Sequence, residues 1–264
     1  MTRDFEKEDA MRLKGKVALI TGGGSGMGRE MAKLFAAEGA KVVVGEWNEA
    51  TLAEVIAEVK AAGGQITGVQ GSVADAADCD RMIDTAVKTY GRLDVLCNNA
   101  GVMDLFQGVA EMSDEQMDRC WGINVKGPVN LSRLAVPIMK AQGGGSIVNS
   151  SSAAGVGGAA AGAAYTMSKH AVIGLTKNTA FRYAGDGVRC NAMAIGAVET
   201  NIMSSVDQTK LDMEALGILG KWHACTPGTL KPIDVANLAL FLASDDAVHL
   251  SGAVIAIDMG WVAA

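Results

Sequence analysis

The sequence predicts a single α/β domain in which a doubly wound parallel sheet carries helices on both faces. Three observations lead to this prediction. Short apolar runs alternate with segments of helical periodicity, glycines crowd the connection between the first run and the first helical segment, and no Pro-rich linker divides the 264 residues. Alternation of this kind specifies right-handed crossovers between neighbouring parallel strands.

The first two elements show the two patterns. Residues 17–21 form a short apolar run, which is typical of a strand buried on both faces. Residues 26–38 have helical spacing, with Met27, Met31 and Leu34 on one side. The chain therefore opens with a strand followed by an amphipathic helix.

The same two patterns continue along the chain. We expect the remaining strands at residues 41–45, 65–70, 93–97, 146–150, 188–194 and 253–257. We expect the remaining helices at residues 49–62, 76–90, 113–140, 163–184 and 232–243. Residues 196–227 follow neither pattern, so we expect an irregular stretch there.

Composition excludes several classes of protein. Apolar residues make up 49% and charged residues 20%, as in an ordinary soluble domain, and the net charge of −6 opposes nonspecific nucleic-acid binding. No apolar run approaches the ~20 residues that a membrane span needs. Residues 1–13 are charged and lack the apolar core of a signal peptide. We expect them to form a flexible leader before one domain at residues 14–264.

The cysteines and histidines predict neither a disulfide framework nor a metal site. The five cysteines are scattered and form no Cys-x-x-Cys pair, which favours reduced thiols and a cytoplasmic location. His170, His223 and His249 are isolated from one another and from the cysteines. We therefore expect no bound metal.

The connection at residues 21–28 reads Thr-Gly-Gly-Gly-Ser-Gly-Met-Gly. Glycines at such a turn let the backbone approach a pyrophosphate, and the next helix offers free N–H groups and the positive end of its dipole. A phosphate-hydrolysing loop would need Lys and then Ser or Thr after its last glycine, whereas this chain has Arg29-Glu30. The pattern favours a dinucleotide site, and a plain turn is the alternative.

A carboxylate at the end of the second strand indicates which dinucleotide would bind. Glu46 can accept hydrogen bonds from the adenosine ribose hydroxyls and would repel a 2′-phosphate. Neither Ser25 nor Trp47 is basic, so nothing there compensates that phosphate. The sequence therefore predicts NAD, the alternative for Glu46 being a solvated carboxylate at a strand end.

Three polar residues form a candidate proton-transfer group. Tyr165 and Lys169 are four apart on a predicted helix, which places their Cβ atoms about 5–6 Å apart on one face. An ammonium there stabilises a phenolate, so we expect Lys169 to lower the pKa of Tyr165. Ser152 follows a predicted strand and can bind the same substrate oxygen. A surface Tyr and Lys on an ordinary helix is the alternative interpretation.

These motifs together resemble the short-chain dehydrogenase/reductase family. The resemblance rests on Thr-Gly-x-x-x-Gly-x-Gly at 21–28, Asn-Asn-Ala-Gly at 98–101, and Ser152 with Tyr165 and Lys169, and it extends over about residues 14–261. It implies a seven-stranded Rossmann-like sheet that binds a nicotinamide cofactor and an enzyme that transfers hydride to or from a carbonyl carbon.

The resemblance also implies roles for single residues. Tyr165 would be the acid/base, Lys169 would lower its pKa and bind the nicotinamide ribose, and Ser152 would polarise the substrate oxygen. Asn124 would kink its helix and hold a water of the proton relay, whereas without the motifs it would be read as a buried capping residue. The implied cofactor-binding residues are Gly22, Ser25, Gly26, Met27, Gly28, Glu46, Ser72, Val73, Asn98, Ala100, Gly101, Tyr165, Lys169, Val198 and Thr200.

The chain departs from the family pattern at three positions. Ser72 replaces the usual Asp before Val73, and its hydroxyl can bond the adenine amino group without charge. Ile195 replaces the usual Pro before Gly196, so we expect a less rigid loop beside the nicotinamide. Met259 replaces a frequent Gly, which requires either an ordinary φ or a strained loop.

The substrate is predicted only as a class. Residues 197–227 are expected to form a substrate loop or lid, and their apolar side chains favour a hydrophobic or aromatic ketone or secondary alcohol. A lid helix that packs on its own domain is the alternative interpretation of these apolar side chains. Lys210 and Lys221 are single charges there, which argues against acyl-carrier substrates. The alternatives are an NADP-linked 3-oxoacyl-type reductase and a non-catalytic NAD-binding sensor on the same fold.

The predicted helices at 113–140 and 163–184 suggest self-association. The second carries more small apolar surface than one sheet face needs, and in the family these helices pair across a two-fold axis. We expect a homotetramer, or else a dimer, with residues 261–264 near an interface. Burial of the same residues inside one subunit is the alternative.

Overall fold

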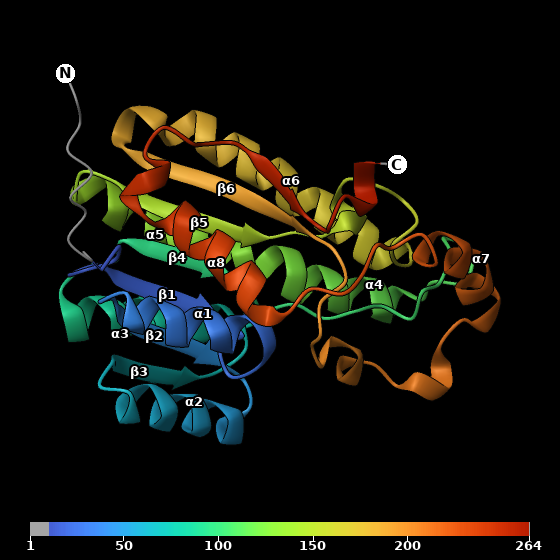
Figure 1. Cartoon of the computed structure of the whole chain (residues 1–264), viewed down its shortest axis with the longest axis horizontal. Coiled ribbons are helices and arrows are strands. Elements are labelled where there is room, and N and C mark those ends of the chain that lie inside the picture. The colour runs from blue at the N-terminus through green and yellow to red at the C-terminus, as the bar shows by residue number, and fades with distance from the viewer. Residues whose placement is uncertain (1–10, 264) are drawn as a thin grey trace.

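The computed structural model describes residues 11–263 and contains one seven-stranded sheet in the order β3-β2-β1-β4-β5-β6-β7 (Figure 1). Every neighbouring pair of strands is parallel, which confirms the doubly wound α/β prediction. The strands are β1 Val17–Thr21, β2 Lys41–Glu46, β3 Gln65–Gln70, β4 Val95–Asn98, β5 Gly145–Ser150, β6 Val188–Ile195 and β7 Val254–Ile257. All differ from the predicted bounds by at most two residues at either end.

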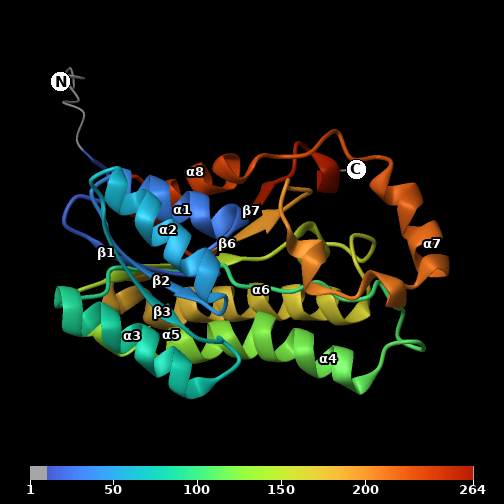
Figure 2. The ribbon, with the colours of Figure 1, turned by 90° about the horizontal axis from the view of Figure 1, so that it is seen from below.

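Two layers of helices cover the sheet, as the view from below shows (Figure 2). One layer contains α1 (Gly26–Ala37), α2 (Glu49–Ala61) and α8 (Pro232–Ala243), and its apolar residues share one core cluster with the sheet. The other layer contains α3 (Ala76–Tyr90), α5 (Gly127–Ala141) and α6 (Ala163–Tyr183), which belong to the second cluster. Both faces of the parallel sheet are therefore buried, as its apolar strands require.

The strand order reverses between β1 and β4. The chain leaves β1 toward β2 on one side, whereas β4 lies on the other side of β1 and leads toward β5. The loops at the carboxyl ends of these strands diverge and leave a crevice, where ligands of open α/β sheets bind. The fold thus positions residues after Thr21 and Asn98 at one edge.

The predicted helix at 113–140 is divided into three segments. α4 (Asp114–Trp121) and α5 are joined by a π-helical segment, Gly122–Lys126. Asn124 lies in this segment, and its side chain bonds the backbone N–H and C=O of Val102 at 2.9 and 3.0 Å. Segments of this kind occur frequently at functional sites, and single-sequence periodicity does not reveal them.

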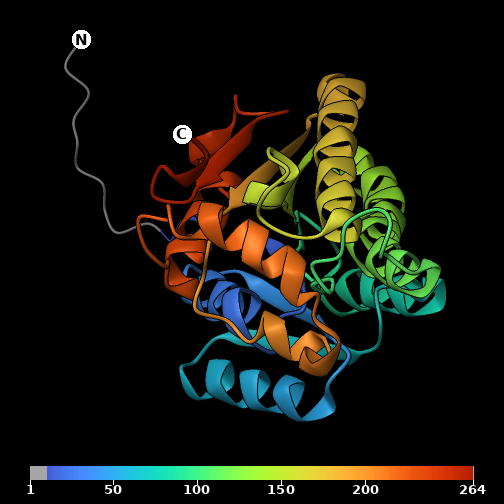
Figure 3. The ribbon, with the colours of Figure 1, turned by 90° about the vertical axis from the view of Figure 1, so that its right-hand side faces the viewer.

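The expectation of an irregular stretch at 196–227 was wrong in part. Residues 213–223 form the helix α7 (Met213–His223), which begins where Asp212 accepts a hydrogen bond from the N–H of Ala215 at 2.9 Å. Gly217 and Gly220 weaken the helical propensity, and none of the helix's residues is fully buried, so no apolar face was visible in the sequence. Figure 3 shows this segment crossing the end of the sheet.

The N-terminal boundary of the domain lies earlier than expected. The prediction placed residues 1–13 in a leader, but Leu13 is fully buried in the core and its N–H bonds the carbonyl of Glu38 at 2.9 Å. The part of the leader at residues 1–10 lies outside the described residues. Between residues 11 and 263, no helix is long and apolar enough to span a membrane.

Candidate active site

A cavity of about 850 Å³ lies at the carboxyl edge of the sheet. It brings together most of the residues that the sequence singled out: the glycine turn, Glu46, the loops after β3 and β4, and the polar group around Tyr165. Gly28, Asn98 and Asn124 do not line it. One continuous space therefore connects the expected cofactor residues to the expected catalytic residues.

The glycine turn has the shape that a close backbone approach requires. Gly22 has φ +62° and a Cβ at this position would lie 3.0 Å from Cα of Ala100. Gly28 packs α1 against the turn, since a Cβ there would lie 2.1 Å from the carbonyl oxygen of Gly22. The Ser25 side chain does not cap α1, and its first turn carries no acidic residue. The residues present thus fit a bound pyrophosphate.

Glu46 is buried where the turn meets β2. Its Oε2 accepts a hydrogen bond from the N–H of Gly24 at 3.0 Å, and its Oε1 accepts one from Asn48 at 3.1 Å. The carboxylate still lines the cavity. Arg29, the nearest base on α1, is paired instead with Glu58 and Glu54. No basic side chain within the described lining stands beside Glu46.

The loop after β4 is fixed to the end of β1. The Thr21 hydroxyl accepts hydrogen bonds from the N–H groups of Asn99 and Ala100, both at 3.1 Å. Asn99 lines the cavity, whereas Asn98 is buried and bonds Asn149 at 2.8 Å inside the core. The prediction that Asn98 contacts the cofactor is therefore not supported by its position, and Asn99 takes the place at the cavity.

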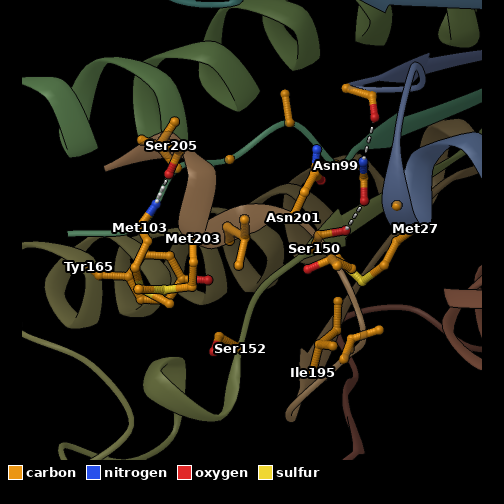
Figure 4. A pocket seen from close by; sticks show the side chains of 18 of the residues that line it. Met27, Asn99, Met103, Ser150, Ser152, Tyr165, Ile195, Asn201, Met203 and Ser205 are labelled. Atoms are coloured by element: carbon orange, nitrogen blue, oxygen red, sulfur yellow. Dashed lines mark hydrogen bonds between the residues drawn. The ribbon is translucent and has the colours of Figure 1, made fainter. Parts of the chain in front are cut away.

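Ser152, Tyr165 and Lys169 all line the cavity, and Figure 4 shows Ser152 and Tyr165 there. Tyr165 and Lys169 project from the first turns of α6, and Ser152 follows β5. The Nζ of Lys169 donates to the carbonyl of Ser150 at 3.0 Å and lies 5.2 Å from the centre of the Tyr165 ring. Hydrogen bonding connects the Ser152 side chain to Tyr165, so the three side chains form one polar group on the lining of the cavity.

The pKa of Tyr165 differs from the expectation. Burial raises it above the ordinary value, hydrogen bonding with Ser152 lowers it, and the charges of Asp104 and Cys120 raise it. Burial also lowers the pKa of Lys169 to about 8. The prediction of a lowered phenol pKa was therefore wrong, because desolvation by burial raises the pKa of Tyr165.

Asn124 connects the active-site segments from behind the cavity. Besides holding Val102, its amide donates to the Ser168 hydroxyl at 3.1 Å, and Ser168 donates to the carbonyl of Tyr165 at 2.7 Å. A Cβ at Gly101 would lie 3.4 Å from both the Asn124 oxygen and the Lys169 nitrogen. The side chains of Asn124 and Lys169 therefore both approach Gly101, which leaves space between them.

The three positions that depart from the family pattern are all described by the structure. Ile195 is the last residue of β6, and the next N–H, of Gly196, donates to the carbonyl of Ile257 at 2.9 Å, so the strand pairing continues to the start of the loop. Met259 has φ +58°, which is the strained alternative. Ser72 lines the cavity, and its N–H donates to Asp78 at 2.7 Å.

The segment after β6 closes the far side of the cavity. Val198 and Thr200, expected at the cofactor, line it together with Ile202 and Met203. Ser205 accepts a hydrogen bond from the N–H of Met103 at 3.1 Å (Figure 4). This bond holds the segment against the loop after β4.

Arg119 of α4 supports the same junction. It donates to the carbonyl of Met103 at 3.0 Å and to the carbonyl of Ser205. It also lines the cavity. Arg119 was not among the predicted site residues, because no local motif connects it to Met103 or Ser205, which lie 16 and 86 residues away.

The rings of Phe106, His223 and Trp261 line the end of the cavity near α7, whereas Trp222 does not line it. Trp222 stacks on Trp261 with ring centres 3.9 Å apart, and His223 stands edge-on to Phe106 at 6.4 Å. His223 and Phe106 were not among the predicted site residues, because they are far apart in the sequence and only the fold brings their rings together. Trp261 is buried within its own chain, so its expected place at an interface is not supported; Ala264 lies outside the described residues.

Comparison with known proteins agrees with this geometry. The sequence model of a family described as short chain dehydrogenase matches residues 16–211. The 3beta-hydroxysteroid dehydrogenase 2 of Eggerthella lenta is 38% identical, over 95% of this chain and 96% of that protein. The 3-oxoacyl-(acyl-carrier-protein) reductase of Thermotoga maritima is also 38% identical, over 96% of this chain and 100% of that protein. A short chain dehydrogenase from Mycobacterium paratuberculosis, solved bound to NAD, superimposes with a TM-score of 0.88 at 31% identity, over 96% and 100% of the two chains.

Proposed function

Because the chain belongs to the short-chain dehydrogenase/reductase family, we propose that this oxidoreductase transfers a hydride between NAD(H) and a secondary alcohol or ketone. One observation carries the proposal. The cavity that contains Ser152, Tyr165 and Lys169 is continuous with the glycine turn and Glu46. The candidate proton-transfer group and the residues proposed to bind the dinucleotide therefore line the same cavity.

The cofactor would be held by residues along the lining from the glycine turn to Thr200. Gly22, Ser25, Gly26 and Met27 would face the pyrophosphate, and Ser72 and Val73 the adenine. When bound, the nicotinamide ring would supply or accept the hydride. Ala100, Gly101 and Val198 also line the path.

The buried position of Glu46 supports NAD over NADP. A 2′-phosphate would meet a desolvated carboxylate whose oxygens are already fixed by Gly24 and Asn48. Arg29 is held by two glutamates on α2 and is not free to compensate it. Like charges in such a site disfavour the phosphorylated cofactor.

The chain's own residues would move the proton. In ketone reduction the Tyr165 hydroxyl would donate to the substrate oxygen, while the Ser152 hydroxyl would bind the same oxygen. In alcohol oxidation Tyr165 would accept the proton. Lys169 would stabilise the phenolate and bind the nicotinamide ribose, and Asn124 would hold its neighbouring loop in register through Val102.

The substrate would be hydrophobic or aromatic. The cavity wall near Tyr165 is lined by Phe106, Ile202, Met203, His223 and Trp261. These apolar and flat surfaces suit a ring-shaped alcohol or ketone. The segment at residues 197–227 would act as the substrate loop or lid that completes this wall.

An NADP-linked 3-oxoacyl-type reductase is the second candidate. The 38% identity to a reductase of that name favours it. The absence of a basic side chain beside Glu46 in the described lining disfavours it. A non-catalytic NAD-binding sensor would have no need for Ser152, Tyr165 and Lys169 in one wall.

A substrate screen with both cofactors, followed by NADH or NADPH absorbance, tests the proposal. We expect turnover of hydrophobic secondary alcohols or ketones with NAD(H). Tyr165→Phe is the control that shows whether the absorbance change depends on the active site, because this substitution keeps the fold intact and removes the hydroxyl of the proposed acid. Activity confined to NADPH and acyl thioesters would instead select the second candidate.

Assembly and location belong to the same proposal. We infer a homotetramer, with a dimer as the lesser form, because α6 exposes Phe181 at 89% and Met167 lies exposed on the same helix. The five cysteines carry no disulfide among the described residues, which supports a cytoplasmic location. Light scattering at micromolar concentration tests the assembly, and a monomer mass would contradict it.

A further inference from the structure

A buried carboxylate, that of Asp104, lies at the N-terminal end of α6, and the proposed mechanism assigns it no role. Asp104 lies in the loop after β4 and is 2% exposed. Its Oδ1 accepts hydrogen bonds from the N–H groups of Phe106 at 3.0 Å and Gly162 at 3.1 Å, and its Oδ2 accepts one from Tyr165 at 2.9 Å. A single side chain therefore connects two loops to the proposed acid/base.

The start of α6 lacks a cap of its own. Gly162 occupies the N-cap position and has no side chain, and the first turn carries no acidic residue. Asp104 supplies the missing acceptor and negative charge from a distant segment. The Tyr165 N–H is one of the backbone donors without an intrahelical partner at the N-terminal end of α6. The Asp104 carboxylate therefore bonds directly to the backbone of the residue that would carry the proton.

The backbone around Asp104 leaves space for its carboxylate. A Cβ at Gly162 would lie 2.6 Å from Oδ2 of Asp104. Phe106 has φ +63°, a conformation that L-residues adopt rarely, and its N–H bonds Asp104. The N–H of Ala163 also donates to Gln107 at 2.8 Å. Each feature holds the loop after β4 against the first turn of α6.

We propose that Asp104 is a positioning residue, which fixes the backbone of Tyr165 and so sets where its phenol meets the substrate oxygen. This inference rests on the proposed function of Tyr165. Asp104 itself would touch neither substrate nor cofactor, because the Asp104 side chain is absent from the cavity lining whereas Tyr165 and Phe106 are part of it.

The charge of Asp104 gives the proposal a specific signature. It opposes ionisation of Tyr165 and raises the pKa of that phenol. The other titratable or charged groups in the cluster are Cys120 and Arg119 of α4 and Lys169 of α6. Burial raises the pKa of Cys120 to about 11, so this thiol is neutral at working pH. Asp104 is therefore the negative charge whose removal shifts Tyr165.

The test compares Asp104→Asn with wild type. The Asn side chain has a similar volume. Its NH₂ group, however, is a donor and replaces one of the two carboxylate oxygens that now accept hydrogen bonds from backbone N–H groups. We expect kcat to fall about tenfold or more, as for loss of one hydrogen bond to a charged group, with the KM for NAD unchanged. We also expect the rising limb of the pH profile for alcohol oxidation to move to lower pH, since a neutral neighbour favours the phenolate.

Asp94→Asn is the matched control. Asp94 is also a buried carboxylate that accepts a backbone hydrogen bond, from Val17 at 2.8 Å, but it lies at the opposite end of β4. We expect this variant to lose stability without moving the pH profile. A drop in kcat for Asp104→Asn with the rising limb in place would mean a merely structural role and would overturn the proposal.

A second measurement is independent of turnover. Amide hydrogen exchange at Gly162 and Tyr165 should become faster in Asp104→Asn than in Asp94→Asn, and unchanged protection would overturn the proposal. If wild type shows no dehydrogenase activity, the proposed function fails while exchange still tests the contact. If Asp104→Asn does not fold, Asp104→Ser keeps a hydroxyl acceptor at the start of α6 and removes the charge. We expect it to move the rising limb to lower pH as well, and an unmoved limb would overturn the proposal.

Discussion

Lys169 lies across the ring of Tyr165, with its ammonium nitrogen 5.2 Å from the ring centre and bonded to the Ser150 carbonyl at 3.0 Å. Both side chains are buried, so each desolvates the other. The four-residue spacing on α6 places them together, while Ser150 at the end of β5 fixes the ammonium. The pair is therefore arranged as one unit whose proton affinity depends on burial as much as on charge.

Removing the ammonium should change stability in a pH-dependent way. The pKa of Lys169 is lowered to about 8 by burial, so between roughly pH 8 and the unfolded value near 10.5 the unfolded chain binds the extra proton. Stability contributed by this group therefore rises with pH across that window. We expect Lys169→Met to exceed wild type near pH 7 by an amount on the order of 1–3 kcal/mol, and the gap to close by pH 10.

Urea unfolding of both proteins at pH 7, 8.5 and 10 measures that gap. The same variant should lose turnover and NAD affinity together, because Lys169 is proposed to serve both. A gap that does not change with pH would show that the ammonium is not desolvated in the folded protein.

Neutralising the carboxylate at the end of β2 should reduce the preference for NAD. Glu46→Gln removes the charge and keeps most of the shape that Gly24 and Asn48 contact. We expect the ratio of kcat/KM for NAD to that for NADP to fall about tenfold, since like-charge repulsion in a buried site is lost. Glu46→Ala should relax the ratio too, but with weaker binding of both cofactors because the turn loses its support. Steady-state kinetics with one active substrate decides, and an unchanged ratio in Glu46→Gln would refute the assignment.

Relieving the backbone at Met259 should stabilise the protein. Its φ of +58° is disfavoured for any residue with a Cβ, and the side chain is 56% exposed, so little burial is lost on removing it. We expect Met259→Gly to raise the free energy of unfolding by about 1 kcal/mol, and Met259→Ala to give no gain. Chemical denaturation of the two variants separates backbone strain from side-chain contacts. Equal stability of both would mean that the loop is not strained.

Local sequence patterns predicted the strands of the sheet and many of the residues that line the cavity. Val17–Thr21 was placed correctly because an apolar run of this length and a following glycine turn have few alternatives. Ser152, Tyr165 and Lys169 were found because their spacing fits one strand end and one helix face. For Asn98 and Asn99 the sequence does not say which side chain faces the cavity, because adjacent residues at a strand end point to opposite sides; in the structure Asn99 lines the cavity and Asn98 bonds Asn149.

The remaining site residues depend on long-range contacts. Asp104 and Tyr165 are 61 residues apart, and Met103 and Ser205 are 102 apart, so no local period connects them. Asp104 is the one acidic residue in the otherwise apolar segment 102–106, and this feature could have marked it as a buried carboxylate. A lid helix was only an alternative for this stretch, and the bounds of α7 were not predicted, because its glycines weaken the helical pattern and none of its residues is fully buried.

The proton-transfer role of Tyr165 is the central claim, and comparison of Tyr165→Phe with wild type tests it most directly. The variant keeps the ring, removes the hydroxyl, and leaves the N–H to Asp104 in place. Tyr183→Phe, at the far end of α6, is the matched control. The measurement is kcat for the best substrate of the screen, together with the dissociation constant for NADH. We expect turnover to fall by about a thousandfold or more in Tyr165→Phe, with NADH affinity within about twofold of wild type and Tyr183→Phe unaffected. Substantial turnover in Tyr165→Phe would contradict the account.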